Sequence, residues 1–115
     1  MRFMIIVKAS KDSEAGKMPS RELLEAMGKY NEELVKAGIM LAGEGLHPSS
    51  KGARVRFAGD RRIVTDGPFT ETKEVISGFY LIDAPSKERA LELALRIPTV
   101  SRMGGAIEIR PLVER

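Results

Sequence analysis

The feature that most constrains the fold is a pair of amphipathic helices, each lying between two apolar strands. The first helix is predicted over 21–38, after the N-cap candidate Ser20 and with Gly38 at the position of a C′ glycine. The second is predicted over 87–97, with Ser86 as N-cap and Pro98 as the stop. The residues expected to face inward are Leu23, Met27, Tyr30 and Leu34 in the first helix and Leu91, Ala94 and Leu95 in the second.

Apolar or alternating segments around these helices predict the strands, at 2–8, 39–46, 53–58, 61–65, 78–84 and 106–113. Gly59-Asp60 predicts a two-residue hairpin turn, with Val55 and Phe57 facing inward. In the second strand, Gly43 and Gly45 indicate a bulge or a close backbone approach. The order predicts an α+β, ferredoxin-like βαββαβ fold with a hairpin insertion, in one domain over 1–115. Both helices then cover one face of an antiparallel sheet.

Two helices can cover only one face of such a sheet, yet its central strands are apolar on both faces. In each of these strands the two faces carry different apolar sets, and either set could lie under the helices. In strand 2–8 the sets are Phe3, Ile5 and Val7 against Met4 and Ile6, and in strand 78–84 they are Phe79 and Leu81 against Tyr80 and Ile82. The uncovered apolar face needs a partner or a ligand. A second copy of the chain is the simplest cover, so the sequence predicts a homodimer that packs sheet to sheet.

Composition argues against several other classes of protein. The 115 residues contain no cysteine, which excludes disulfides, zinc–thiolate sites and thiol nucleophiles. No apolar run approaches the roughly 18–20 residues that span a bilayer, and the apolar start is too short for a signal peptide. We therefore expect a cytoplasmic protein with no membrane partner. The net charge of +3 is mild and the basic residues are interspersed, which argues against nucleic-acid binding.

Four ionisable residues lie within nine positions of the stretch "VTDGPFTETKEVISGFYLID": Asp66, Glu71, Lys73 and Glu74. A turn aspartate usually accepts a hydrogen bond from the N–H two residues on, but here that residue is Pro68, which has no N–H. Asp66 must reach the N–H of Phe69, another segment or a ligand. If 69–74 forms a helical turn, Glu71 and Glu74 share a face; if it is extended, Glu71 and Lys73 do. A solvated surface loop is the alternative to a site.

This stretch resembles the signature of the DGPF branch of the YCII-related family, through Asp66-Gly67-Pro68-Phe69 followed by Lys73-Glu74. The segments "MGKYNEELVKAGIMLAGEGLHPSSKGARVR" and "AIEIRPL" resemble other parts of that branch, so the resemblance covers most of residues 1–112. It implies a dimeric α+β barrel, in which two ferredoxin-like sheets pack face to face. It also implies a pocket in each subunit near the sheet and the 66–74 segment, but it implies no particular reaction.

The resemblance does not extend to the acid–base dyad of the better-known YCII proteins, which pairs a histidine on the first helix with an aspartate. The predicted helix 21–38 contains no histidine. His47, the single histidine of the chain, follows the glycine-flanked strand 39–46 and is the candidate general base because imidazole titrates near neutral pH. Asp66 would orient its ring if the strand ends converge. A solvent-facing loop histidine is the alternative.

Two classes of function follow. The first is a small-molecule-binding protein or enzyme with His47 and Asp66 as candidate catalytic residues and with ligand contacts from Asp66, Phe69, Glu71, Lys73, Glu74 and Tyr80. No phosphate loop, dinucleotide motif or diagnostic metal-ligand spacing is present, so we expect no cofactor and no metal. The second is a regulatory protein–protein interaction module, because DGPF proteins often accompany extracytoplasmic-function sigma factors.

Overall fold

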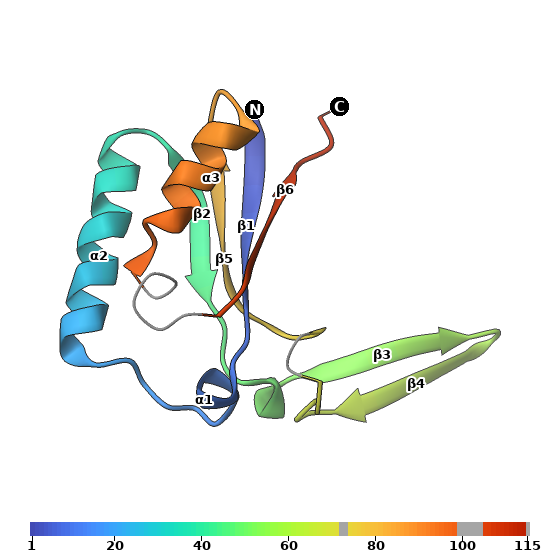
Figure 1. Ribbon diagram of the computed structural model, residues 1–115. Coiled ribbons are helices and arrows are strands. Elements are labelled where there is room, and N and C mark those ends of the chain that lie inside the picture. Colours follow the sequence, from blue (N-terminus) through green and yellow to red (C-terminus); the bar gives the residue numbers. More distant parts are fainter. Residues whose placement is uncertain (72–73, 99–104, 115) are drawn as a thin grey trace.

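The chain folds into a four-stranded antiparallel sheet with helices on one side and a separate two-stranded hairpin (Figure 1). The computed structural model describes residues 1–71, 74–98 and 105–114. In chain order the elements are β1 Arg2–Lys8, α1 Lys11–Glu14, α2 Arg21–Lys36, β2 Met40–Gly45, the short 3₁₀ turn η1 Ser49–Lys51, β3 Ala53–Ala58, β4 Arg61–Asp66, β5 Ile76–Asp83, α3 Lys87–Leu95 and β6 Ile107–Pro111.

The strand order β2-β5-β1-β6 is that of a ferredoxin-like sheet with a hairpin inserted after its second strand, as predicted. All its neighbouring strands pair antiparallel. The register shifts between Met40 and Ala42, before the glycines at which the sequence predicted a bulge or a close backbone approach. At Gly43 the backbone does approach β5 closely, since an added Cβ would lie 3.3 Å from the Phe79 carbonyl oxygen. Pro111 ends β6 at the sheet edge, where its missing N–H interrupts no inner ladder.

Local signals fix both long helices. The side chains of Ser20 and Ser86 accept hydrogen bonds from the N–H groups of Leu23 and Arg89, which caps the starts of α2 and α3. Gly38 has φ of 72° just after the end of α2, the left-handed conformation that a C′ glycine supplies. The segment between β1 and α2 contains the four-residue helix α1, and a capping box between Ser10 and Ser13 stabilises its first turn.

The core lies between the sheet and the two long helices, and it consists of Phe3, Ile5, Tyr80 and Ile82 from the sheet with Leu34, Ala90, Leu93, Ala94 and Ile97 from the helical side. The predicted inward face of α3 is wrong for two of its three residues. Leu91 and Leu95 are 47% and 60% exposed, whereas Ala94 is buried as predicted. The small side chains of Ala90 and Ala94 let α3 approach the sheet closely. Neighbouring Leu93 and Ile97 complete that stripe.

The prediction for the hairpin is also wrong in one respect. The β3–β4 ribbon extends away from the sheet (Figure 1), and Val55 and Phe57 are 49% and 68% exposed rather than inward. Their strands pair only with each other within the described residues, so no second layer covers them. The Arg62 guanidinium lies 5.3 Å from the centre of the Phe57 ring and shields part of it.

The face of the sheet opposite the helices carries a second apolar set, as the sequence predicted. Register pairs Met4 with Leu81 and Ile6 with Phe79 on that face, and all four are half-buried. Both long helices pack on the other side, against Phe3 and its neighbours. Among the described helices none has the length and apolarity that crossing a bilayer requires.

Candidate functional site

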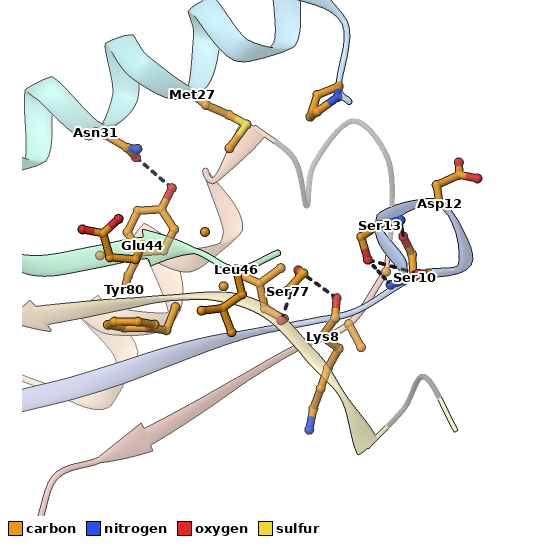
Figure 2. Close-up of a pocket in the computed structure, with 18 of the residues that line it drawn as sticks. Lys8, Ser10, Asp12, Ser13, Met27, Asn31, Glu44, Leu46, Ser77 and Tyr80 are labelled. Atoms are coloured by element: carbon orange, nitrogen blue, oxygen red, sulfur yellow. Dashed lines mark hydrogen bonds between the residues drawn. The ribbon is translucent and has the colours of Figure 1, made fainter. Parts of the chain in front are cut away.

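A cavity of about 650 Å³ lies between α2, the region of α1 and the adjacent ends of β1, β2 and β5 (Figure 2). Its volume lies within the range of roughly 300–1,000 Å³ that is typical of small-molecule pockets. We call it the larger pocket. Its wall combines glycine backbone, methionines and several polar side chains.

Glycines form the part of the larger pocket that β2 and β5 contribute, at Gly43, Gly45 and Gly78. Gly45 lies opposite Gly78 in the register. A Cβ on Gly78 would lie 2.9 Å from the Glu44 carbonyl oxygen, whereas one on Gly45 would meet nothing within 4 Å. The cavity exists because no side chains stand on this part of the sheet. Gly45 is the position at which a side chain could enter it without a clash.

Three methionines line the same cavity from three different segments: Met18 before α2, Met27 in α2 and Met40 in β2. Figure 2 shows Met27 extending from α2 toward the sheet. Methionine has an unbranched, polarisable side chain that adapts to irregular shapes and makes favourable contacts with aromatic rings. This wall can therefore adjust to ligands of somewhat different shape.

One hydrogen-bonded polar pair joins two of the elements that line the cavity. The Tyr80 hydroxyl donates a hydrogen bond to Asn31 Oδ1 at 2.7 Å, which links β5 to α2 (Figure 2). Tyr80 is only 7% exposed, and burial raises the pKa of its hydroxyl although the bond to Asn31 opposes this. The phenol is therefore neutral at physiological pH. Asn31 follows Met27 by four residues, so one face of α2 carries both.

The charged groups of the larger pocket are mostly neutralised. Lys8 is its single basic residue among those described, and its ammonium lies 3.6 Å from Glu108. Asp12 pairs with Lys17 at 3.4 Å. Glu44 also lines the wall and has no ion-pair partner in the described part of the chain. A ligand here meets no unpaired cation, so the electrostatics favour an uncharged or cationic molecule over an anion.

The Asp-Gly-Pro-Phe motif forms a junction between the hairpin and the loop after β2. Gly67 N–H donates to the Gly52 carbonyl at 3.0 Å, and Phe69 N–H donates to Ser49 Oγ at 3.0 Å. Ser49 is 8% exposed, and its N–H and hydroxyl both donate to the Glu14 carboxylate. These bonds lower the pKa of Glu14, with the side-chain bond from Ser49 the largest cause. The motif thus fastens the hairpin to α1 through Ser49.

Comparison with known proteins agrees with this architecture. The model of the YCII-related domain matches residues 1–115. The chain belongs to the YCII-related family. It is 39% identical over 92 residues to an uncharacterized protein of Rhizobium meliloti (strain 1021), covering 80% of this chain and 71% of the relative. Both the family and the fold class predicted from the sequence are thereby confirmed.

A solved structure with the same fold is 5-chloro-2-hydroxyhydroquinone dehydrochlorinase (TftG) from Burkholderia phenoliruptrix AC1100, in complex with 2,5-dihydroxybenzoquinone. The TM-score is 0.58, and the match covers all of this chain and 96% of that chain at 20% identity. At this identity the likeness shows the fold alone.

The structure distributes the predicted site residues of this YCII-related protein over two hollows. Tyr80 lines the larger pocket, while His47, Phe69 and Glu74 line a second hollow of about 420 Å³. Leu46 lies on the wall of both. The two hollows are therefore neighbours around the loop that follows β2.

Two of the remaining predicted residues, Asp66 and Glu71, line neither hollow. Asp66 and Glu71 are exposed, and Lys73 lies outside the described residues. Glu74 N–H donates to the Glu71 carbonyl at 2.9 Å. No hydrogen bond or ion pair joins His47 to Asp66 in the described part of the chain, so their catalytic pairing stays a prediction. The described residues also contain no cluster of three or more potential metal ligands.

Sequence reasoning missed Asn31 and Ser49. Asn31 sits beside the predicted inward face of α2, four residues after Met27, and that spacing could have identified it. Ser49 carries no such signal, because its role depends on Glu14 and Phe69, which lie far from it in the sequence.

Proposed function

We propose that this YCII-related protein binds a small molecule in the larger pocket and serves as a binding protein for that molecule or as an enzyme acting on it. The observation that carries the proposal is the hydrogen bond between Tyr80 and Asn31, which joins β5 to α2 at a cavity that glycine backbone and three methionines also line. A few fixed polar groups in a mostly apolar cavity are the usual composition of a ligand site.

The pair limits the chemistry of the ligand. The Tyr80 hydroxyl donates its proton to Asn31, so its oxygen can accept a hydrogen bond while the Asn31 amide N–H groups can donate. This combination suits a hydroxyl or a carbonyl on a compact, uncharged or cationic molecule. The fold neighbour TftG has its structure in complex with 2,5-dihydroxybenzoquinone, a small ring bearing such oxygens. That supports ring compounds of similar size as the first ligands to test.

We also propose that two copies pack through the apolar sheet face that carries Met4, Ile6, Phe79 and Leu81. These side chains are half-buried in one chain and would be covered by the same face of a second copy. Native mass spectrometry of gently purified protein measures the assembly directly. A monomer at micromolar concentration would contradict this part of the proposal, and extra mass on a dimer would identify a bound ligand.

Ligand-observed NMR against a set of small phenols, quinones and cyclic ketones tests the pocket. Gly45→Val should abolish binding of the compounds that bind the wild type, because the new side chain enters the cavity without a backbone clash. Tyr80→Phe should weaken binding of hydroxyl-bearing compounds about tenfold, since it removes the oxygen that can accept their hydrogen bond.

Gly28→Ala is the control for this test, because Gly28 lies on α2 outside the pocket with nothing within 4 Å of an added Cβ. It should bind as the wild type does. Compounds that bind the wild type and the Gly45→Val variant equally would show that the larger pocket is not their site.

A further inference from the structure

The second hollow, of about 420 Å³, has a different character from the larger pocket. Basic side chains from three segments line it: His47 after β2, Lys51 in η1 and Arg54 in β3. Glu74 is its one acidic residue among those described. None of the ion pairs within the described residues involves His47, Lys51 or Arg54. Three basic groups that converge on a concave surface without carboxylate partners create a positive potential that attracts anions.

The Arg54 side chain is exposed, and one face of its guanidinium packs on an aromatic ring. Its guanidinium carbon lies 3.9 Å from the centre of the Phe69 ring. The backbone of Phe69 is in turn fixed by Ser49, whose hydroxyl accepts its N–H. Stacking uses the face of the guanidinium and leaves the N–H groups in its plane available for a forked contact with an anion. The pocket therefore presents a preorganised donor.

Much of the rest of the wall is apolar. Leu46, Phe69, Val75 and Ile76 contribute side chains, and Val75 is buried. Inorganic anions gain nothing from such a surface, whereas an anion with an apolar body buries area against it. We propose that this hollow is a second binding site, for a small organic anion in which a carboxylate or similar group is attached to an apolar or aromatic body. Arg54 binds the anionic group, Lys51 and His47 add charge, and Phe69 with Ile76 contacts the body.

This site is distinct from the larger pocket and takes a different class of ligand. The larger pocket offers an anion no unpaired cation among the described residues, because Lys8 pairs with Glu108. His47 makes the test simple, because it is the single histidine of the chain and its ring protons give signals that need no assignment. Titration with sodium benzoate, followed by proton NMR, should shift the His47 signals saturably. Benzamide has the same ring without the charge and should shift them far less, and inorganic phosphate should bind more weakly than benzoate.

Variants locate the site. Arg54→Gln and Lys51→Gln should each weaken benzoate binding, with Arg54→Gln doing so by about tenfold because a charge-assisted contact is lost. Arg56→Gln is the matched control, since Arg56 lies two residues further along β3, is exposed and lines neither hollow. Its affinity for benzoate should equal that of the wild type. Gly45→Val should also leave benzoate binding unchanged.

Several results would overturn the proposal. The absence of any shift of the His47 signals on addition of benzoate would overturn it. An equal shift on addition of benzamide would overturn it too. Equal loss of affinity in the Arg54→Gln and Arg56→Gln variants would show a diffuse charge effect instead of a site. Loss in Gly45→Val would place benzoate in the larger pocket. Phosphate binding as tight as benzoate binding would refute the assignment to an organic anion.

Discussion

Gly67 is the residue of the Asp-Gly-Pro-Phe motif whose replacement the structure constrains most. A Cβ at this position would lie 1.7 Å from the carbonyl oxygen of Ser49 and 2.5 Å from its carbonyl carbon, both backbone atoms. Ordinary contact begins near 3.4 Å, so Gly67→Ala requires the two backbone segments to separate by well over an ångström. No rotation of a side chain can relieve a clash with backbone.

The hydrogen bonds that such a separation breaks set the magnitude. Those from Gly67 N–H to Gly52 and from Phe69 N–H to Ser49 are each 3.0 Å long and would both leave hydrogen-bonding range. At about 0.5–1.5 kcal/mol for each bond, Gly67→Ala should lower the free energy of unfolding by about 1–3 kcal/mol. Urea unfolding followed by circular dichroism measures it.

Gly52→Ala is the matched control. Gly52 belongs to the same junction, its φ of −112° suits any residue, and a Cβ there would lie 3.5 Å from the Ser49 oxygen, an ordinary contact. This variant should equal the wild type or exceed it by about 0.4–1 kcal/mol through reduced entropy of the unfolded chain. Two variants that differ by less than about 0.5 kcal/mol would refute the claim that close backbone packing at the motif stabilises the fold.

Three further predictions test other contacts. Glu14→Gln should make the free energy of unfolding less sensitive to acid, because hydrogen bonds from Ser49 lower the pKa of Glu14 from 4.5. The ionised Glu14 carboxylate stabilises the fold above pH 4.5, and that stabilisation is lost as the pH falls through the lowered pKa. Unfolding curves of both proteins at pH 6 and at about pH 3 measure the difference. Leu93→Ala should cost about 2–5 kcal/mol of unfolding free energy, against less than about 1 for exposed Leu91→Ala; equal costs would refute the assigned face of α3. Tyr30→Phe should cost about 1 kcal/mol by urea unfolding, because it removes the 2.6 Å hydrogen bond from the Tyr30 hydroxyl to the Leu93 carbonyl, and an unchanged midpoint would contradict this.

The elements that could be predicted from sequence are those whose signals are local. Ser20, Ser86 and Gly38 mark helix ends through groups on neighbouring residues, so their roles are visible in the sequence. The face of α3 was missed because Leu91 and Leu95 are as apolar as Leu93, and only the sheet decides which stripe it covers. The inward direction of Val55 and Phe57 failed for a related reason, since alternation shows which residues share a face but not whether anything lies against it.

The candidate site was less predictable because it depends on contacts between residues that are far apart in the sequence. Tyr80 was named from the sequence, but its partner Asn31 lies 49 residues away and the pocket wall depends on the glycines of two strands meeting in register. His47, Phe69 and Glu74 line one hollow, and their role in a site stays a prediction. The place of Arg54 beside this hollow could not be read from the sequence, because only the fold brings its guanidinium over the Phe69 ring.

The geometry of the motif bears on what its presence can mean. Gly67 and Phe69 donate their backbone N–H groups to Gly52 and Ser49, and Asp66 and Glu71 remain exposed where the chain passes from the exposed ribbon toward β5. The motif thus determines where the hairpin leaves the body and how the Phe69 ring is presented. A sequence signal that serves this junction predicts the attachment of the hairpin but not the ligand. The ligand depends on side chains outside the motif, such as Asn31 and Tyr80 in one pocket and Arg54 in the other, and substitutions there should change binding without disturbing the junction.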